Sequence, residues 1–209
     1  MDKKNKLVKK LECMSTATIS DALFLMGYKR FTMKARIKPI APEMRLAGQA
    51  FTVKAYPGGT YACELALGKV EKGQVLVIDG GGFLDAVLWG EIFSRMAMIK
   101  GVKGTVIDGA VRDVESIRKL RFPLFAAGVI PAAGTADRLG EIEIPISCGG
   151  VVVHPCDWVF GDILGVVVVP AELLEETEKH CQIVLDKERE IIKKLNGKLK
   201  MAVKNETNL

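Results

Sequence analysis

Apolar positions recur along most of the chain, at spacings that switch between a helical and an extended period. From Leu7 to Met26 they fall at helical spacing, and Gly27 marks a stop. The polar run from Ser15 to Thr18 can cap a second helix that starts near Ser20. We therefore expect two helices at this end of the chain.

Short apolar runs bounded by glycine or proline predict strands. The run from Val75 to Asp79 is apolar enough to be buried on both faces, and Gly80 to Gly82 are expected to end it. Further strands are predicted at residues 48–55, 105–108, 123–126, 151–154 and 166–169.

Helical spacing returns between these strands. Residues 61–67 and 114–120 are predicted to form short helices, and a third helix ends near Ile99 after starting either near Leu84 or at Gly90. Pro170 is expected to open a long helix from residue 171 to about 196, because proline is preorganised for a first helical position. Alternating strands and helices without a linker or repeat predict one mixed α/β domain, residues 1–209, with helices at both ends.

The composition excludes several classes of protein. The 209 residues are 49% hydrophobic and 26% charged, which is sufficient for a sizeable core. The net charge of +5 lies largely near the two ends, and only 6% of residues are aromatic, so no nucleic-acid surface is expected. Five scattered cysteines without zinc spacing indicate reduced thiols, and no apolar run is long enough for a bilayer. We expect a cytoplasmic protein with no membrane partner.

The most informative segment runs from Gly101 to Val114. An apolar strand enters a glycine turn, which then presents Arg112 and Asp113 side by side. Neither charge is easily buried alone, but arginine can bind a carboxylate or enolate oxygen while aspartate holds a divalent cation such as Mg²⁺ or Mn²⁺. The alternative is a surface salt bridge in a loop.

A second candidate site surrounds Gly90. If a helix starts there, its first backbone amides lack partners and form an anion site, which the helix dipole strengthens. The alternative is a glycine turn that only reverses the chain. Neither a phosphate-binding loop nor a dinucleotide-binding glycine motif is present.

Other polar residues are weaker candidates. Ligands in α/β folds gather at the carboxyl ends of strands, where several acids occur. These are Asp79, Asp85, Asp108 and Asp113. Lys54 is a weak candidate for a Schiff base. His154 and His180 are interpreted as structural or solvated, and Asp157 and Asp162 as turn formers.

Taken in order, several segments resemble those of the RraA-like family, which includes the 4-hydroxy-4-methyl-2-oxoglutarate aldolases and the regulator of ribonuclease activity A. The resemblance covers roughly residues 10 to 190, and its middle block is the most specific. The segments are Ser15–Ala22, Gly48–Val53, Gly80–Gly82, Trp89–Glu91, Gly101–Val114, Phe122–Ala126 and Gly161–Pro170. Where the family often has Gly-Asp before the buried strand, this chain has Gly73-Gln74.

The resemblance implies a swivelling α-β-β-α sandwich that assembles into homotrimers or homohexamers, with active sites between subunits. It implies that Arg112 contacts the oxygens of a pyruvyl group and that Asp113 anchors Mg²⁺, mostly through water. Further acids are expected from the terminal helices of a neighbouring subunit, with Asp21 and Glu188 as candidates. The backbone amides implied to hold the pyruvyl carboxylate are those of Gly90, Glu91, Ile92 and Phe93.

The implied function is that of a metal-dependent lyase. It would cleave a carbon–carbon bond next to a 2-oxo acid through a pyruvate enolate, as an aldolase, an oxaloacetate decarboxylase or both. The alternative is a non-catalytic regulator that binds an endoribonuclease. A methyltransferase is disfavoured, because no glycine-rich cofactor loop follows the first strand.

Overall fold

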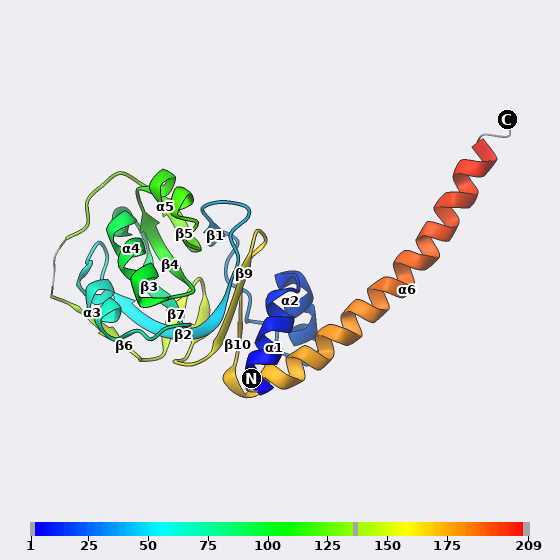
Figure 1. Cartoon of the computed structure of the whole chain (residues 1–209), viewed down its shortest axis with the longest axis horizontal. Coiled ribbons are helices and arrows are strands. Elements are labelled where there is room, and N and C mark those ends of the chain that lie inside the picture. Colours follow the sequence, from blue (N-terminus) through cyan, green and yellow to red (C-terminus); the bar gives the residue numbers. More distant parts are fainter. Residues whose placement is uncertain (1–2, 136–137, 207–209) are drawn as a thin grey trace.

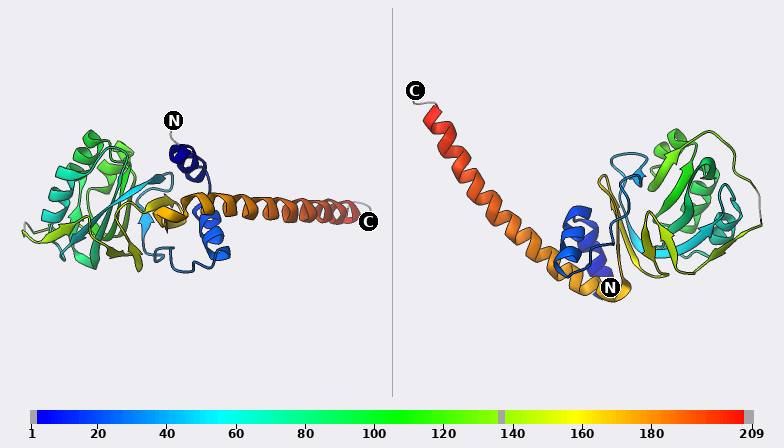
Figure 2. Two further views of the ribbon diagram at one scale, coloured as in Figure 1. Left: turned by 90° about the horizontal axis from the view of Figure 1, so that it is seen from below. Right: turned by 180° about the vertical axis from the view of Figure 1, so that it is seen from behind.

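The computed structural model describes residues 3–135 and 138–206, with side chains described for residues 6–135 and 138–198. It confirms a mixed α/β fold with helices on both sides of the strands, in α-β-β-α order (Figures 1 and 2). The helices are α1 (Lys3–Glu12), α2 (Thr16–Leu25), α3 (Tyr61–Lys69), α4 (Glu91–Lys100), α5 (Val114–Leu120) and α6 (Leu174–Glu206), with a short 3-10 turn η1 (Ala171–Leu173) before α6.

Most strands of the described chain belong to one sheet with the order β1-β5-β4-β3-β2-β9-β10, and β6 pairs with β2. The central strands β2 to β5 are parallel, whereas β9 and β10 are antiparallel to their neighbours. A separate hairpin pairs β7 with β8. The strands are β1 (Lys38–Pro39), β2 (Leu46–Ala55), β3 (Val75–Trp89), β4 (Gly104–Val111), β5 (Leu124–Val129), β6 (Gly140–Ile142), β7 (Ile146–Cys148), β8 (Val151–Val153), β9 (Trp158–Asp162) and β10 (Gly165–Val169).

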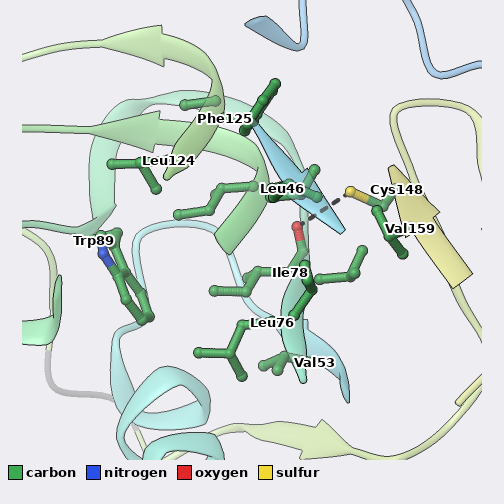
Figure 3. Packing of buried hydrophobic residues seen from close by; sticks show 14 of the residues in the cluster. Leu46, Val53, Leu76, Ile78, Trp89, Leu124, Phe125, Cys148 and Val159 are labelled. Carbon is green, nitrogen blue, oxygen red and sulfur yellow. Dashed lines mark hydrogen bonds between the residues drawn. The ribbon is translucent and has the colours of Figure 1, made fainter. Parts of the chain in front are cut away.

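The larger hydrophobic core lies on both faces of the parallel strands. Residues 75–79 of β3 and the whole of β4 are buried, as expected for strands covered by other elements on both sides. Figure 3 shows part of this core, with Ile78 in the middle of the view. The thiol of Cys148 donates to the Ile78 carbonyl at 3.6 Å, so the β7–β8 hairpin is linked to β3.

A second core joins α1, α2 and the first part of α6 to the outer face of β9 and β10 (Figure 1). Asp162 at the end of β9 fixes this layer, because its carboxylate accepts from the backbone nitrogen and the hydroxyl of Thr16 at 2.9 and 2.7 Å. Beyond Val184, α6 continues away from the body of the protein (Figure 2). Ile191 and Ile192 on that part are more than half exposed.

Several sequence predictions need correction. The second helix begins at Thr16 rather than near Ser20, because Ser15 caps it through a bond from Ala17 N at 3.2 Å. The long C-terminal helix begins at Leu174 after a 3-10 turn, with Pro170 before that turn, and extends to Glu206. Strand β9 was not predicted, since its flanking aspartates indicated a turn.

The prediction that Gly80 to Gly82 end a strand is wrong. The strand β3 runs on to Trp89, although its register with β4 shifts three times after Asp79. Gly80 lies so close to Leu88 and to the Asp108 carbonyl that a Cβ atom would clash with both. Glycine is therefore required here for close packing within the sheet rather than for chain termination.

Candidate active site

The Arg112–Asp113 turn follows the buried strand β4 directly. Arg112 N donates to the Trp89 carbonyl at 3.0 Å, which fixes the turn to the end of β3. Asp113 precedes α5 and has a φ of 56°, in the left-handed region that few non-glycine residues adopt. Such strain persists only where surrounding contacts impose it, and it is common at functional sites.

Helix α4 begins at Glu91 with Gly90 as its cap, which confirms one of the two predicted starts. Ser94 N is the first amide of this helix with a helical acceptor, the Gly90 carbonyl at 3.1 Å. The helix therefore presents its earlier amides at this end, as the anion site requires.

The two candidate segments form one constellation. Asp113 Oδ2 accepts from Glu91 N at 3.1 Å, and Arg112 Nε lies 3.7 Å from the same oxygen. The Arg112 and Asp113 side chains are 43% and 41% exposed, so solvent and small molecules can reach them. One amide of the expected anion site therefore binds the protein's own carboxylate.

Gly90 is required by this arrangement. A Cβ atom at this position would lie 2.7 Å from Asp113 Oδ2, which is shorter than any normal contact. Its φ of −153° is extended and open to any residue, so the constraint is space and not backbone conformation. Glycine thus allows the Asp113 carboxylate to approach the start of α4.

Two consecutive hydrogen bonds from buried side chains hold the backbone at Gly90 in place. Trp89 Nε1 donates to Ser94 Oγ at 2.9 Å, and Ser94 Oγ donates to the Gly90 carbonyl at 3.1 Å. Both side chains are buried, so these bonds are shielded from water. These hydrogen bonds tie the indole on β3 to the start of α4 and fix the backbone beneath Asp113.

Two hollows meet at Arg112 and Asp113. One, of about 350 Å³, extends over the start of α4 towards α3 and includes Thr60, Glu64 and Gly134 in its wall. The other, of about 400 Å³, has an apolar wall of Val129, Ile130 and Pro131. A volume of this size accommodates a small organic acid.

The electrostatics at the start of α4 favour ionised Glu91. A hydrogen bond from Arg95 (2.8 Å) lowers the pKa of Glu91, with further lowering by Ser116 and by the charges of Arg95 and Lys119. Its carboxylate is engaged by Arg95 and does not line the hollow. The backbone amide of Glu91 is bound by Asp113, so the residues of this turn that line the hollow are Gly90, Ile92 and Phe93.

The structure separates the other strand-end acids from this site. Asp79 pairs with Lys54 at 2.6 Å, and Asp108 pairs with Arg36 at 2.6 Å, all outside the two hollows. The ion pair also makes Lys54 a poor Schiff-base candidate, because its Nζ is bound by the Asp79 carboxylate and lies outside both hollows. Asp85 is exposed on β3. Of the four acids, only Asp113 reaches the hollows.

The remaining candidates have structural or surface positions. His154 lies at the surface with Nδ1 3.6 Å from Asp157, and His180 contacts the Glu176 carbonyl within α6. Asp157 accepts from the backbone amides of His154 and Ala171, so it joins β8 to η1 rather than only forming a turn. Asp21 and Glu188 lie exposed on α2 and α6 and do not line either hollow.

The donor set fits a magnesium ion held mainly by water. Among the residues whose structure is described, no group of three or more histidine, cysteine or acidic side chains could enclose a metal. Asp113 supplies one accessible carboxylate beside the hollow, with Glu64 in the same wall. Mg²⁺ commonly keeps several waters and binds one or two protein carboxylates together with substrate oxygens.

Sequence reasoning missed Glu64 and Ser94. Glu64 lies in the wall because α3 packs beside α4, whose first residues line the same hollow. No local pattern in the sequence indicates that contact. Ser94 lies four residues after Gly90 on a helix, a spacing at which a serine hydroxyl can reach the Gly90 carbonyl.

Comparisons with known proteins agree with this architecture. A model of the RraA-like family, described as Aldolase/RraA, matches residues 16–168. A protein of Methanocaldococcus jannaschii is 43% identical over 158 residues, covering 74% of this chain and 76% of its own. The 4-hydroxy-4-methyl-2-oxoglutarate aldolase of Thermus thermophilus is 32% identical over 133 residues, covering 64% of this chain and 80% of its own.

A solved structure from Streptomyces coelicolor, RraAS2, superposes with a TM-score of 0.80 at 26% identity. The match covers 91% of this chain and 98% of that chain. That protein is described as an unusual member of the RNase ES inhibitor RraA protein family. Within the described residues, no helix has the length and apolar character needed to cross a membrane.

Proposed function

Because this chain belongs to the RraA-like family, we propose that it is a divalent-metal-dependent lyase that forms pyruvate enolate from a 2-oxo acid. The observation that carries the proposal is the placement of Arg112 and Asp113 against the start of α4, beside a hollow of about 350 Å³. The aldolase name of the Thermus thermophilus relative supports the same chemistry.

The residues have separate roles in this reaction. The 2-oxo acid binds with its carboxylate at the start of α4, where Ile92 and Phe93 amides precede the first helical hydrogen bond. Arg112 places its guanidinium near the 2-oxo oxygen, where negative charge develops as the enolate forms. Trp89 and Ser94 hold the backbone of this site in place.

Two types of substrate would lose a carbon–carbon bond at C3 and give the same pyruvate enolate. In an aldol substrate, the hydroxyl on C4 loses its proton, the C3–C4 bond breaks and its electron pair enters the pyruvate enolate, leaving an aldehyde or ketone. In oxaloacetate, the bond to the distal carboxylate breaks and releases carbon dioxide. A proton then adds to C3 of the enolate in both cases and gives pyruvate.

Asp113 is the residue that would hold the divalent cation, Mg²⁺ or Mn²⁺, mostly through water. When bound, such a cation supplies Lewis-acid polarisation of the 2-oxo group. The oxygen donor and the room beside it suit a hard, hydrated ion.

We also propose that the chain works as a homotrimer or homohexamer. Exposed apolar side chains on α4 support association, with Ile92 72% exposed and Ile99 87% exposed. A neighbouring subunit could then add acids such as Asp21 or Glu188 to the site.

The test measures pyruvate released from oxaloacetate and from a 4-hydroxy-2-oxo acid, with Mg²⁺, with Mn²⁺ and with EDTA. The rate without enzyme is subtracted, because metal ions alone decarboxylate oxaloacetate. We expect metal-dependent release that is lost in Asp113→Asn and kept in the control Asp85→Asn, which changes an exposed acid outside the hollow. A folded protein that releases no pyruvate from any substrate with any metal would overturn the proposal.

The second candidate is a non-catalytic regulator that binds an endoribonuclease, which the name of the RraAS2 neighbour favours. Such a protein needs a binding surface but neither Arg112 nor a metal. Pull-down of a purified endoribonuclease by the wild type and by Arg112→Ala would support this function if both variants bind equally.

A further inference from the structure

A third hollow, of about 430 Å³, lies at the end of the parallel strands opposite to Arg112 and Asp113. Its wall includes Lys103, directly before β4, whereas Arg112 directly follows β4. Helix α1 forms another side of the hollow and packs against β2. Among the described residues, none lines both this hollow and either of the two at the candidate active site, so it is a separate place in the fold.

Backbone hydrogen bonds fix the loops that line this hollow. Gly73 N donates to the Gly101 carbonyl at 2.9 Å. Lys103 N donates to the Gln74 carbonyl at 2.8 Å. The aliphatic stem of Lys72 lies over Gly101, where a Cβ atom would come within 2.8 Å of Lys72 Cγ. The loops before β3 and β4 therefore hold Lys72 and Lys103 beside the same hollow.

The hollow gathers charged side chains from three separate segments. The cations are Lys9 on α1, Lys72 and Lys103, and the acids are Glu12 on α1 and Glu71. In the part of the chain that the structure describes, none of these five groups is in an ion pair. Three ammonium groups against two carboxylates give the hollow a net positive charge, which favours an anionic ligand.

The same wall also offers neutral polar groups and apolar surface. Gln49 and Gln74 carry amides that both donate and accept hydrogen bonds, and Val8 and Trp158 add apolar surface. Ammonium groups bind phosphate oxygens, whereas carboxylates repel phosphate but accept hydrogen bonds from hydroxyl groups. The set therefore suits a ligand that carries a phosphate at one end and several hydroxyl groups at the other.

We propose that this hollow binds a small phosphorylated polyhydroxy compound, such as the phosphate ester of a sugar alcohol. Lys9, Lys72 and Lys103 bind the phosphate, and Glu12 and Glu71 accept hydrogen bonds from the hydroxyl groups. A volume of about 430 Å³ accommodates a molecule of this size. The inference does not rest on the proposed lyase function, because its residues lie outside the hollows at Arg112 and Asp113.

The test measures binding to the full-length protein, in its own oligomeric state, by isothermal titration calorimetry. The three probes are sorbitol 6-phosphate, inorganic phosphate and sorbitol, which present both kinds of group, the phosphate alone and the hydroxyls alone. We expect sorbitol 6-phosphate to bind roughly tenfold more tightly than inorganic phosphate, the size of one hydrogen bond to a charged group. Sorbitol, which lacks the phosphate, should bind far more weakly than either.

Substitutions separate the two halves of the ligand. Lys72→Gln and Lys103→Gln should each weaken binding of sorbitol 6-phosphate roughly fivefold, the size of one solvated charge pair. The control Lys69→Gln changes an exposed lysine outside the hollow and should not weaken it. Glu71→Ala should lower the ratio of the sorbitol 6-phosphate affinity to the phosphate affinity, because only the polyol loses a hydrogen-bond acceptor. Arg112→Ala should leave binding unchanged, because Arg112 lies at the other site.

Three results would overturn the proposal. Equal affinity for sorbitol 6-phosphate and inorganic phosphate, or an unchanged ratio in Glu71→Ala, would contradict the assigned ligand class. Absence of saturable binding would show that the hollow is no site in the assembled protein, as when a neighbouring subunit covers it. Loss of binding in Arg112→Ala would assign the phosphate to the candidate active site instead. None of these results bears on the lyase, because pyruvate release is measured separately.

Discussion

Asp113 Oδ2 lies 3.1 Å from the backbone nitrogen of Glu91. This contact joins two segments more than twenty residues apart, each of which the sequence indicates as a candidate site. It also shows that the Asp113 carboxylate and the amides at the start of α4 share one small space. In the proposed reaction, the substrate carboxylate and the Asp113 carboxylate therefore divide these amides between them.

Removal of Arg112 is expected to abolish most turnover without unfolding the protein. Its side chain is 43% exposed and contributes little to the core. We expect Arg112→Ala to lower kcat roughly 10²–10³-fold, as loss of one charge-stabilising donor does. Steady-state kinetics and thermal unfolding check this, with Arg189→Ala on the exposed part of α6 as control. Normal turnover in Arg112→Ala would remove this residue from the mechanism.

Gly90→Ala is expected to impair catalysis by displacing the Asp113 carboxylate. The added methyl would lie 2.7 Å from Oδ2, so the contact with Glu91 N must lengthen. We expect weaker Mg²⁺ activation, seen as a higher metal concentration at half-maximal rate. The matched control is Gly68→Ala in α3, where nothing lies within 4 Å of the new methyl. It should stabilise the fold by about 0.5–1 kcal/mol. Equal metal activation in both variants would contradict the argument.

Asp162 makes the stability of the fold depend on acid pH. Burial raises the pKa of its carboxyl group, but hydrogen bonds from the Thr16 backbone and hydroxyl outweigh this and leave the pKa below its ordinary value of 3.8. The ionised group therefore stabilises the fold fully above that value. This contribution is lost as the pH falls through the lower folded-state pKa.

The variant Asp162→Asn should lower the free energy of unfolding by about 1.5–3 kcal/mol at pH 7, as loss of hydrogen bonds to a charged group does. Urea titrations from pH 7 down to pH 3 measure the difference from wild type. We expect that difference to shrink below pH 3.8. A constant difference across this range would mean that charge on Asp162 is irrelevant to stability.

The cysteines should divide into two reactive and three protected thiols. Cys13 and Cys156 are exposed, whereas Cys63, Cys148 and Cys181 are buried. Burial raises the pKa of Cys63 and of Cys181 to about 12, so neither forms the reactive thiolate at neutral pH.

An aromatic disulfide reagent should therefore label two thiols of the native protein quickly, and all five only after unfolding. Replacing Cys13 and Cys156 by serine should abolish the rapid phase. Rapid labelling of a third thiol would show that one of the buried cysteines is accessible in solution.

Local sequence patterns predict those elements whose residues all have the same kind of surroundings, such as a strand buried on both faces. The apolar run at Val75 is buried on both sides, so its composition alone indicates a central strand. The Arg112–Asp113 pair was identified because two charges directly after such a strand have no structural explanation within the core. The start of α4 at Gly90 was one of two alternatives, and the structure decides between them.

The remaining features depend on contacts between distant segments. Gly80 looks like a strand end in the sequence, yet it is needed because Leu88 and Asp108 pack against it. Asp162 looks like a turn residue, yet it accepts hydrogen bonds from Thr16, 146 positions away. Glu64 lines the hollow together with Gly90 and Gly134, which lie far from it in the sequence. No window of adjacent residues contains this information.

The shifted register of β3 bears on how the pocket could change during evolution. From Asp79 to Trp89 the strand advances ten residues, while its partner advances only three, from Asp108 to Val111. The surplus residues lie between Asp79 and Trp89, and Val87, Leu88 and Trp89 line the hollow. Insertions or deletions in this stretch can thus reshape one wall of the pocket while the sheet before Asp79 keeps its pairing. The extra residues of β3 therefore allow the wall of the hollow to vary between related proteins while the sheet is preserved.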